Sequence, residues 1–120
     1  MRHTRPALAS ARSEIVLASR LAALSSPLDG VTPSIEDAAL ILDDAQAARA
    51  FGFGGKLCIH PRQLAWVSRG FAPTDDEVRW ARKIQAAGEH GAVQVDGAMV
   101  DAPLRALAAD ILAQANCAEA

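Results

Sequence analysis

The most informative segment of the chain for its fold is Phe51-Gly-Phe-Gly-Gly-Lys-Leu-Cys-Ile-His-Pro61. Its glycines indicate a turn, and the short apolar run 57–59 that follows is typical of a buried strand rather than a helix. Pro61 cannot donate a hydrogen bond to a sheet, so the strand should end where this proline begins. His60 is then expected at the carboxyl edge of the strand, where α/β sheets gather their ligands.

Helical and strand-like patterns lie on both sides of this stretch. Apolar spacing predicts helices at about residues 6–24, 34–52, 62–69, 74–87 and from 101 onward. Thr74 and Glu77 predict a capping box at the start of the fourth helix. The last helix is expected to have an apolar stripe, formed by Leu104, Leu107, Ala108, Ile111, Leu112 and Ala115. Leu28 to Val31 is a second short strand candidate, and Gly70 is expected to stop the third helix. Ala92–Val95 and Ala98–Val100, on either side of Asp96-Gly97, predict a β-hairpin. Two short parallel strands do not form a stable sheet alone, so the chain is expected to be part of something larger.

Size and composition narrow the class of protein. A chain of 120 residues with a net charge of −2 fits one domain at most and has no basic footprint for nucleic acid. No apolar stretch is long enough to span a membrane, and no signal-peptide core follows Met1. The two cysteines, Cys58 and Cys117, are expected to be unpaired thiols in a reducing cytoplasm.

Two segments carry a resemblance to a known family. FGFGGKLCIHPRQL, from Phe51, and GAMVDAPLRALAADIL, from Gly97, resemble the citrate lyase β-subunit and malyl-CoA lyase family, the HpcH/HpaI-type aldolases. LDGVT, FAPTDDEVRWARKI and VQVDGAMVDAP match the same family in order and spacing. The resemblance covers the chain from about Ala11 to Ala113, and the joint pattern is specific.

The resemblance implies both a fold and a reaction. The fold would be α/β and helix-rich: residues 1–72 would be the last two strands and helices of a (β/α)₈ TIM barrel, and residues 73–120 a C-terminal extension of helix, hairpin and helix. The reaction would be a Mg²⁺-dependent, reversible cleavage of a 3-hydroxyacyl-CoA thioester such as citryl-CoA or malyl-CoA, in a cytoplasmic homo-oligomer. The family's Mg²⁺ ligands lie on earlier barrel strands, so we expect them upstream, in a missing N-terminal barrel half.

Asp101 matches the aspartate that acts as the acid in this family, where it reaches into a neighbouring subunit's active site and protonates the thioester enolate. The same residue, before Ala-Pro, is also an ordinary helix N-cap, and the two roles are compatible.

The other candidates, all for substrate binding, have structural alternatives. Lys56 could attract a CoA phosphate near the barrel mouth or be simply solvated, which we favour. His60 could bind a ligand or be a hydrogen-bonded structural group, which we favour. Asp29 could face the substrate cavity or form a turn with Gly30, which we favour.

Two functions from different classes therefore stand at this point. The first is the C-terminal part of a citrate lyase β-subunit-like carbon–carbon lyase. The second is a catalytically silent, α-rich module that completes or binds a partner, suggested by the absent metal and carboxylate sites. Binding of Mg²⁺ would favour the first over the second.

Overall fold

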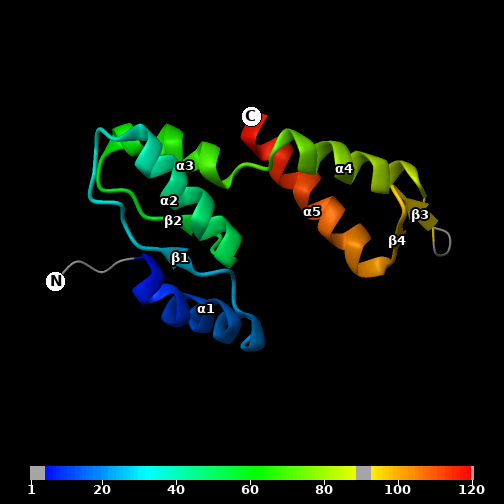
Figure 1. Ribbon diagram of the computed structural model, residues 1–120, viewed down its shortest axis with the longest axis horizontal. Helices are drawn as coiled ribbons and strands as arrows, with labels where there is room; N and C mark the ends of the chain where they lie inside the picture. The colour runs from blue at the N-terminus through cyan, green and yellow to red at the C-terminus, as the bar shows by residue number, and fades with distance from the viewer. Residues whose placement is uncertain (1–4, 89–92, 120) are drawn as a thin grey trace. The chain divides into compact units, whose positions relative to one another are not determined.

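The structure of the protein is a computed structural model that describes residues 5–88 and 93–119 (Figure 1). The chain divides into two compact units, residues 1–71 and residues 72–120. The first contains α1 (Arg5–Leu21), β1 (Leu28–Asp29), α2 (Ala38–Phe51), β2 (Gly55–Lys56), the 3₁₀ turn η1 (Pro61–Gln63) and α3 (Leu64–Phe71). The second contains α4 (Asp75–Ala86), β3 (Val93–Val95), β4 (Ala98–Val100) and α5 (Ala102–Glu119).

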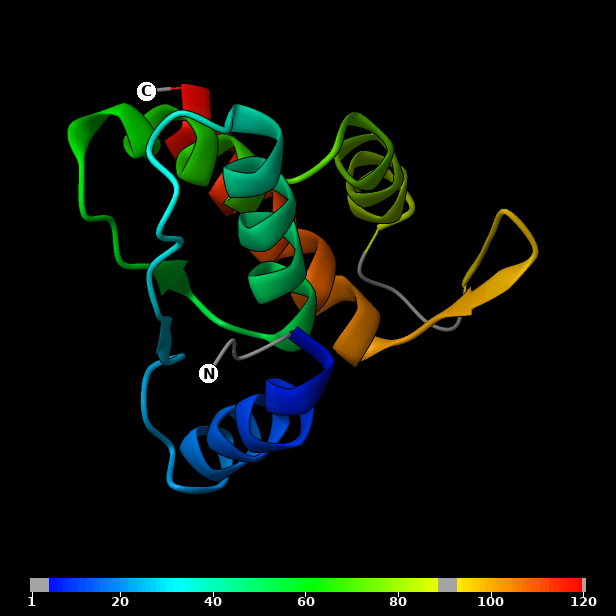
Figure 2. The same cartoon turned by 60° about the vertical axis from the view of Figure 1, so that its left-hand side comes forward.

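The first unit holds the predicted parallel pair, with β1 beside β2 (Figure 2). Leu28 is in register with Gly55 and Asp29 with Lys56. The amide of Leu57 still donates to the carbonyl of Asp29 at 3.0 Å, so the ladder ends there. The prediction of parallel pairing is confirmed, but both strands are shorter than expected.

The predicted buried strand at 57–59 is wrong in position and in burial. The strand is Gly55–Lys56, just before the apolar run, and the side chains of Leu57 and Ile59 are 53% and 54% exposed. Leu28 in β1 is 62% exposed as well. The reason is physical: in the described part of the chain this sheet has two strands, so it lacks the further strands that cover such side chains in larger parallel sheets.

Helix α2 packs against α3 (Figure 2), and it supplies most of the buried hydrophobic residues of the first unit. It begins later than predicted, at Ala38, because Asp37 is the N-cap and accepts a hydrogen bond from the amide of Leu40 at 3.1 Å. Ser34 instead accepts from the amide of Asp37, outside the helix. The buried residues of α2 are Ile41, Ala45 and Ala48.

The predicted stop at Gly70 is also wrong, because α3 continues through it to Phe71. Helix α1 forms as predicted, but its apolar residues Ile15, Leu17 and Leu21 are exposed rather than buried. Helical spacing predicts which residues share a face, and it does not say whether anything covers that face.

The second unit follows its local sequence signals closely. Thr74 and Glu77 form the predicted capping box at the start of α4. Strands β3 and β4 form the predicted antiparallel hairpin, with Asp96 and Gly97 in the left-handed region at φ 49° and 82°. Ala92, the first residue of the predicted hairpin, lies outside the described residues.

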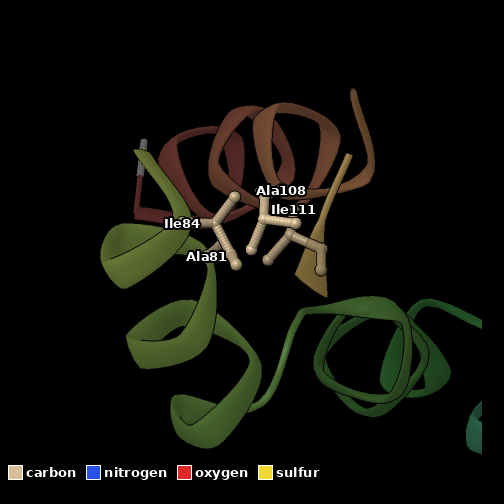
Figure 3. Packing of buried hydrophobic residues seen from close by; sticks show 5 residues of the cluster. Ala81, Ile84, Ala108 and Ile111 are labelled. Carbon is tan, nitrogen blue, oxygen red and sulfur yellow. The ribbon is translucent and has the colours of Figure 1, made fainter. Parts of the chain in front are cut away.

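A small hydrophobic core holds the second unit together. Helices α4 and α5 pack through Ala81, Ile84, Ala108 and Ile111, with Val100 of β4 in the same cluster (Figure 3). The predicted stripe of α5 supplies two of these residues, Ala108 and Ile111, while Leu107 is exposed. Among residues 5–88 and 93–119, none of the helices combines the length and the apolar character that a membrane span requires. The structure is thus a helix-rich α/β fold, as expected.

Candidate functional site

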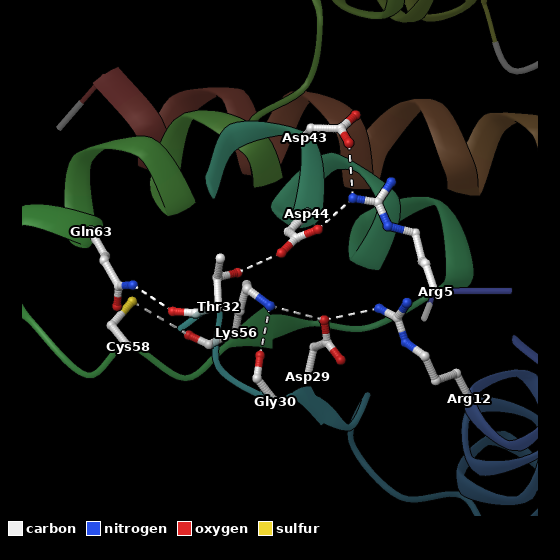
Figure 4. Close-up of polar contacts among 10 residues, drawn as sticks. All are labelled: Arg5, Arg12, Asp29, Gly30, Thr32, Asp43, Asp44, Lys56, Cys58 and Gln63. Carbon is white, nitrogen blue, oxygen red and sulfur yellow. Dashed lines mark hydrogen bonds and ion pairs between the residues drawn. The ribbon is translucent and has the colours of Figure 1, made fainter. Parts of the chain in front are cut away.

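Two of the predicted site residues meet at the carboxyl ends of the parallel strands. Asp29 and Lys56 are register partners, and Lys56 Nζ lies 3.2 Å from Asp29 Oδ2 (Figure 4). Lys56 Nζ also donates to the carbonyl of Gly30 at 2.6 Å. The side chain of Lys56 is only 4% exposed, so the expectation of a solvated lysine is wrong. The carboxylate of Asp29 explains the difference, because it and the carbonyl replace the lysine's water.

A third residue, Arg12 of α1, completes this cluster. Its Nη2 donates to Asp29 Oδ2 at 2.9 Å, so one carboxylate oxygen accepts from both cations. The Arg12 guanidinium carbon lies 4.7 Å from the ring centre of Phe51 and 5.2 Å from that of Phe53. Two cations and one carboxylate leave this cluster with a net charge of +1. Sequence reasoning missed Arg12. The one hint in the sequence was the pair Phe51 and Phe53, whose rings can stack on a guanidinium group.

A second polar group ties α1 to α2 beside this cluster (Figure 4). Arg5 pairs with Asp43 at 2.8 Å and with Asp44, and Thr32 Oγ1 donates to the other oxygen of Asp44 at 2.8 Å. Burial by itself would raise the pKa of Asp44, but the hydrogen bonds from Thr32 and Arg5 outweigh it and hold that pKa below its usual value. The bonds to Asp43 and Asp44 raise the pKa of Arg5.

Gln63 is the second residue that sequence reasoning missed. It is 1% exposed and makes three hydrogen bonds with backbone groups. Its Oε1 accepts from the amide of Ile59 at 2.9 Å, and its Nε2 donates to the carbonyls of Thr32 and Ser34, both at 2.7 Å. Gln63 thus joins the segments that leave β1 and β2, which keeps the ends of both strands together.

His60 has the structural role that we favoured. It caps η1, and its Nδ1 accepts from the amide of Arg62 at 3.1 Å. None of the hydrogen bonds found among the described residues joins His60 to Asp29 or Lys56. The structure therefore pairs two of the three predicted binding residues of the first unit and gives the third a capping contact.

Asp101 lies in the second unit, at the start of α5. It is exposed, and its Oδ1 accepts from the amide of Leu104 at 3.1 Å. This is the N-cap geometry that the sequence predicts. The same carboxylate is open to solvent, so capping does not hide it from a substrate.

The described residues do not fit a magnesium site. Mg²⁺ prefers several carboxylate and water oxygens in octahedral geometry. Across residues 5–88 and 93–119 there is no group of three or more Asp, Glu, His or Cys side chains that could hold a metal ion. The buried carboxylate of Asp29 already accepts from two cations, which leaves it poorly placed to bind a third.

Comparison with known proteins identifies proteins that are similar in sequence to this chain. No protein-family model matches it. It is 40% identical over 108 residues to a citrate lyase subunit beta-like protein of Deinococcus radiodurans, covering 85% of this chain and 38% of that protein. It is 37% identical over 112 residues to the mitochondrial citramalyl-CoA lyase of Rattus norvegicus, covering 88% of this chain and 33% of that enzyme.

Solved structures agree with these matches. The CitE protein of Mycobacterium tuberculosis, solved in complex with magnesium, acetoacetate and coenzyme A, is 34% identical with a TM-score of 0.81, and the match covers 95% of this chain and 43% of that one. A citrate lyase of Burkholderia xenovorans LB400 is 26% identical with a TM-score of 0.73, over 95% of this chain and 37% of that one.

On the evidence of its fold and of these matches, the chain is a relative of carbon–carbon lyases. More particularly, it is related to the citrate lyase β-subunit-like proteins, and the resemblance expected from the sequence is confirmed. The chain spans between about a third and two fifths of the length of the curated relatives it matches. Magnesium is the metal of the solved relative, as the resemblance implied.

Proposed function

We propose that this chain is the C-terminal part of a citrate lyase β-subunit-like lyase, acting in the cytoplasm on a 3-hydroxyacyl-CoA of the citryl-CoA or malyl-CoA type. The observation that carries the proposal is the likeness to the CitE protein solved with magnesium, acetoacetate and coenzyme A. Acetoacetate and coenzyme A are related to the keto-acid and thioester parts of such a reaction. The named lyases among the sequence relatives support the same class.

The first unit would be the closing part of a (β/α)₈ barrel. Its two strands are parallel and connected by a helix, as in such a barrel. The exposed apolar side chains of Leu28, Leu57 and Ile59 support this assignment, because strands of a complete barrel bury such residues on both faces. The second unit would be the C-terminal extension.

The catalytic role falls to Asp101. When the carbon–carbon bond breaks, the thioester fragment leaves as an enolate that must gain a proton. An exposed carboxyl group at the capped start of a helix can deliver that proton when it is protonated, here to a neighbouring subunit's active site in a homo-oligomer. Mg²⁺ supplies charge stabilisation at the keto-acid oxygens when bound. The described residues do not fit that metal, so we assign its ligands to the part of the relatives that this chain does not match.

Substrate binding falls to the strand ends of the first unit. The cluster of Arg12, Asp29 and Lys56 has a net positive charge, which suits a carboxylate or phosphate of the acyl-CoA. His60 follows on the same edge, and its Nε2 is the nitrogen left for a ligand because Nδ1 accepts from Arg62.

A chimaera tests the catalytic proposal. This chain would replace the matching segment of the Deinococcus radiodurans protein, and thioester cleavage would be measured with Mg²⁺ and citryl-CoA, malyl-CoA or citramalyl-CoA. Asp101→Asn keeps a capping oxygen but removes the proton donor, so we expect a loss of about a hundredfold or more in kcat. Asp110→Asn changes an exposed carboxylate on the same helix and should leave kcat unchanged. Equal rates in the two variants would contradict the proposal.

One observation favours the alternative of a catalytically silent module that completes or binds a partner: within the described ranges no group of side chains could hold a metal ion. Turnover by the chimaera separates the two, and titration calorimetry with MgCl₂ shows that the metal site supplied by the Deinococcus radiodurans segment is intact. If the chimaera binds Mg²⁺ and turns over substrate, the lyase proposal is supported. If the chimaera binds Mg²⁺ but turns over no substrate, this chain is a silent module.

A further inference from the structure

We propose that Arg12 is a positioning residue, which holds Asp29 and through it fixes the ammonium group of Lys56 at the strand ends. The role of Lys56 toward an anionic substrate group depends on the function proposed above. The contacts that Arg12 makes do not depend on that function, and they can be tested without substrate.

The first argument is the sharing of a single oxygen. Arg12 Nη2 and Lys56 Nζ both contact Asp29 Oδ2, at 2.9 and 3.2 Å (Figure 4). The side chains of Arg12 and Asp29 are mostly buried, and that of Lys56 almost completely. Since Arg12 comes from α1 and the other two from the parallel strands, this oxygen links the helix to the strand ends. If Arg12 is removed, one of the two donors that hold this oxygen in place is lost.

The second argument is that Arg12 is a poor choice for filling space. Its Nε lies buried with no hydrogen-bond partner among the described residues, which is unfavourable. An apolar side chain would pack between Phe51 and Phe53 without that penalty. The planar guanidinium, by contrast, stacks on rings while its Nη groups still donate. The position is thus suited to a fixed donor aimed at Asp29.

The third argument is what remains on Lys56. An ammonium group has three N–H donors, and the structure uses one on Asp29 and one on the Gly30 carbonyl. Among the described residues no partner is found for the third donor, on a cluster of Arg12, Asp29 and Lys56 that has a net charge of +1 and lies near the carboxylate of Asp44. The arrangement therefore suits a single anionic oxygen, as in a carboxylate or a phosphate, and Arg12 keeps that donor in one place.

The chain provides its own internal control, because Lys56 and Lys83 are its two lysines. Lys83 is 57% exposed and pairs with Asp96 in the second unit. Acetylation of the full chain by an N-hydroxysuccinimide ester, followed by mass spectrometry, gives the ratio of the two rates. In the wild type we expect Lys56 to react much more slowly than Lys83.

Arg12→Met should raise the Lys56-to-Lys83 ratio about tenfold, the effect of losing one charge-assisted hydrogen bond in a mostly buried site. Arg12→Lys restores the charge without the planar fork and should give a smaller rise, about threefold. Arg5→Met is the matched control: Arg5 also ties α1 to the unit, through Asp43 and Asp44, but does not contact Asp29. It should leave the ratio unchanged.

An unchanged or lower ratio in Arg12→Met with a native circular dichroism spectrum would overturn the proposal. An equal rise in Arg5→Met would overturn it too, since the effect would then be a general loosening of α1. If Arg12→Met does not fold, the Arg12→Lys variant decides alone, and an unchanged ratio there overturns the proposal. Failure of the chimaera to turn over substrate bears only on the proposed lyase function.

Discussion

Gly70 of α3 lies directly against Ala45 of α2. A Cβ atom placed on Gly70 would lie 2.4 Å from the Cβ of Ala45, and 3.2 Å from both the Leu42 carbonyl oxygen and the Gln46 amide nitrogen. Real Cβ atoms do not approach each other so closely. The two helices of the first unit can pack at this short distance only because residue 70 has no side chain.

Gly70→Ala should therefore destabilise the chain. Glycine to alanine inside a helix normally gains about 1 kcal/mol, but the backbone of α2 must move to make room, and overpacking of this kind costs about 1–3 kcal/mol. We expect a net loss of unfolding free energy, measured by urea denaturation. Gly30→Ala is the control, because a Cβ there meets nothing within 4 Å. A Gly70→Ala variant more stable than the wild type would show that the helices do not meet at this residue.

This contact also shows where sequence-based prediction stops. From the sequence, Gly70 was expected to end a helix, since a glycine near the end of a helical pattern is a common stop. Its actual role depends on Ala45, twenty-five residues earlier in the chain. Nothing in the local pattern around Gly70 contains that information.

The features that were predicted correctly have their partners close by in sequence. The capping box joins Thr74 to Glu77, the hairpin turns at Asp96-Gly97, and Asp101 caps the next helix. Each depends on residues within a few positions of one another, so the pattern is readable.

The polar cluster of Arg12, Asp29 and Lys56 was only partly predictable, because its members lie far apart in the sequence. Asp29 and Lys56 were separate candidates from the sequence, and nothing in the sequence pattern placed them together, whereas Arg12 comes from a separate helix and was not a candidate. Leu57 and Ile59, which follow β2 and are exposed, were wrongly predicted to be buried, because burial depends on what covers a sheet and an apolar run does not reveal that.

Asp44 should make the stability of the first unit depend on pH. The pKa of Asp44 in the folded chain lies below its ordinary value of 3.8, so the unfolded chain binds the proton more readily. The stabilisation is thus complete above about pH 3.8 and is lost as the pH falls through the lower folded-state pKa. Urea midpoints between pH 2 and pH 6 measure this, at about one-unit steps.

Thr32→Val tests the cause of this pH dependence directly. It keeps the Asp44 carboxylate but removes the hydroxyl that donates to it at 2.8 Å. With less to offset the effect of burial, the folded-state pKa of Asp44 should move up, and the fall in stability with acid should become shallower. An acid response identical to that of the wild type would mean that Thr32 does not stabilise the ionised carboxylate.

Thr74→Ala should destabilise the second unit by about 1 kcal/mol, the usual value of an N-cap side chain. The hydroxyl of Thr74 accepts from the amide of Glu77 at 3.2 Å, and alanine leaves that amide without its partner. Thr74→Ser keeps the oxygen and should keep most of the stability. The measurement is the thermal unfolding midpoint of each variant. Equal losses in Ala and Ser would point to the methyl group rather than the cap.

Gln63→Leu should be the most damaging of these substitutions. Leucine fills a similar volume but leaves the amide of Ile59 and the carbonyls of Thr32 and Ser34 without their partner, at a cost of about 3 kcal/mol or more. Gln63→Glu separates the two ends of the side chain, since it keeps an acceptor for the amide and removes both donated bonds. We expect it to be strongly destabilising too, because its new charge is buried.

Gln46→Leu, at an exposed position on α2, is the matched control and should change the unfolding free energy by less than about 0.5 kcal/mol. If Gln63→Leu unfolded at the same urea concentration as Gln46→Leu, the strand ends would be held together by something other than this side chain.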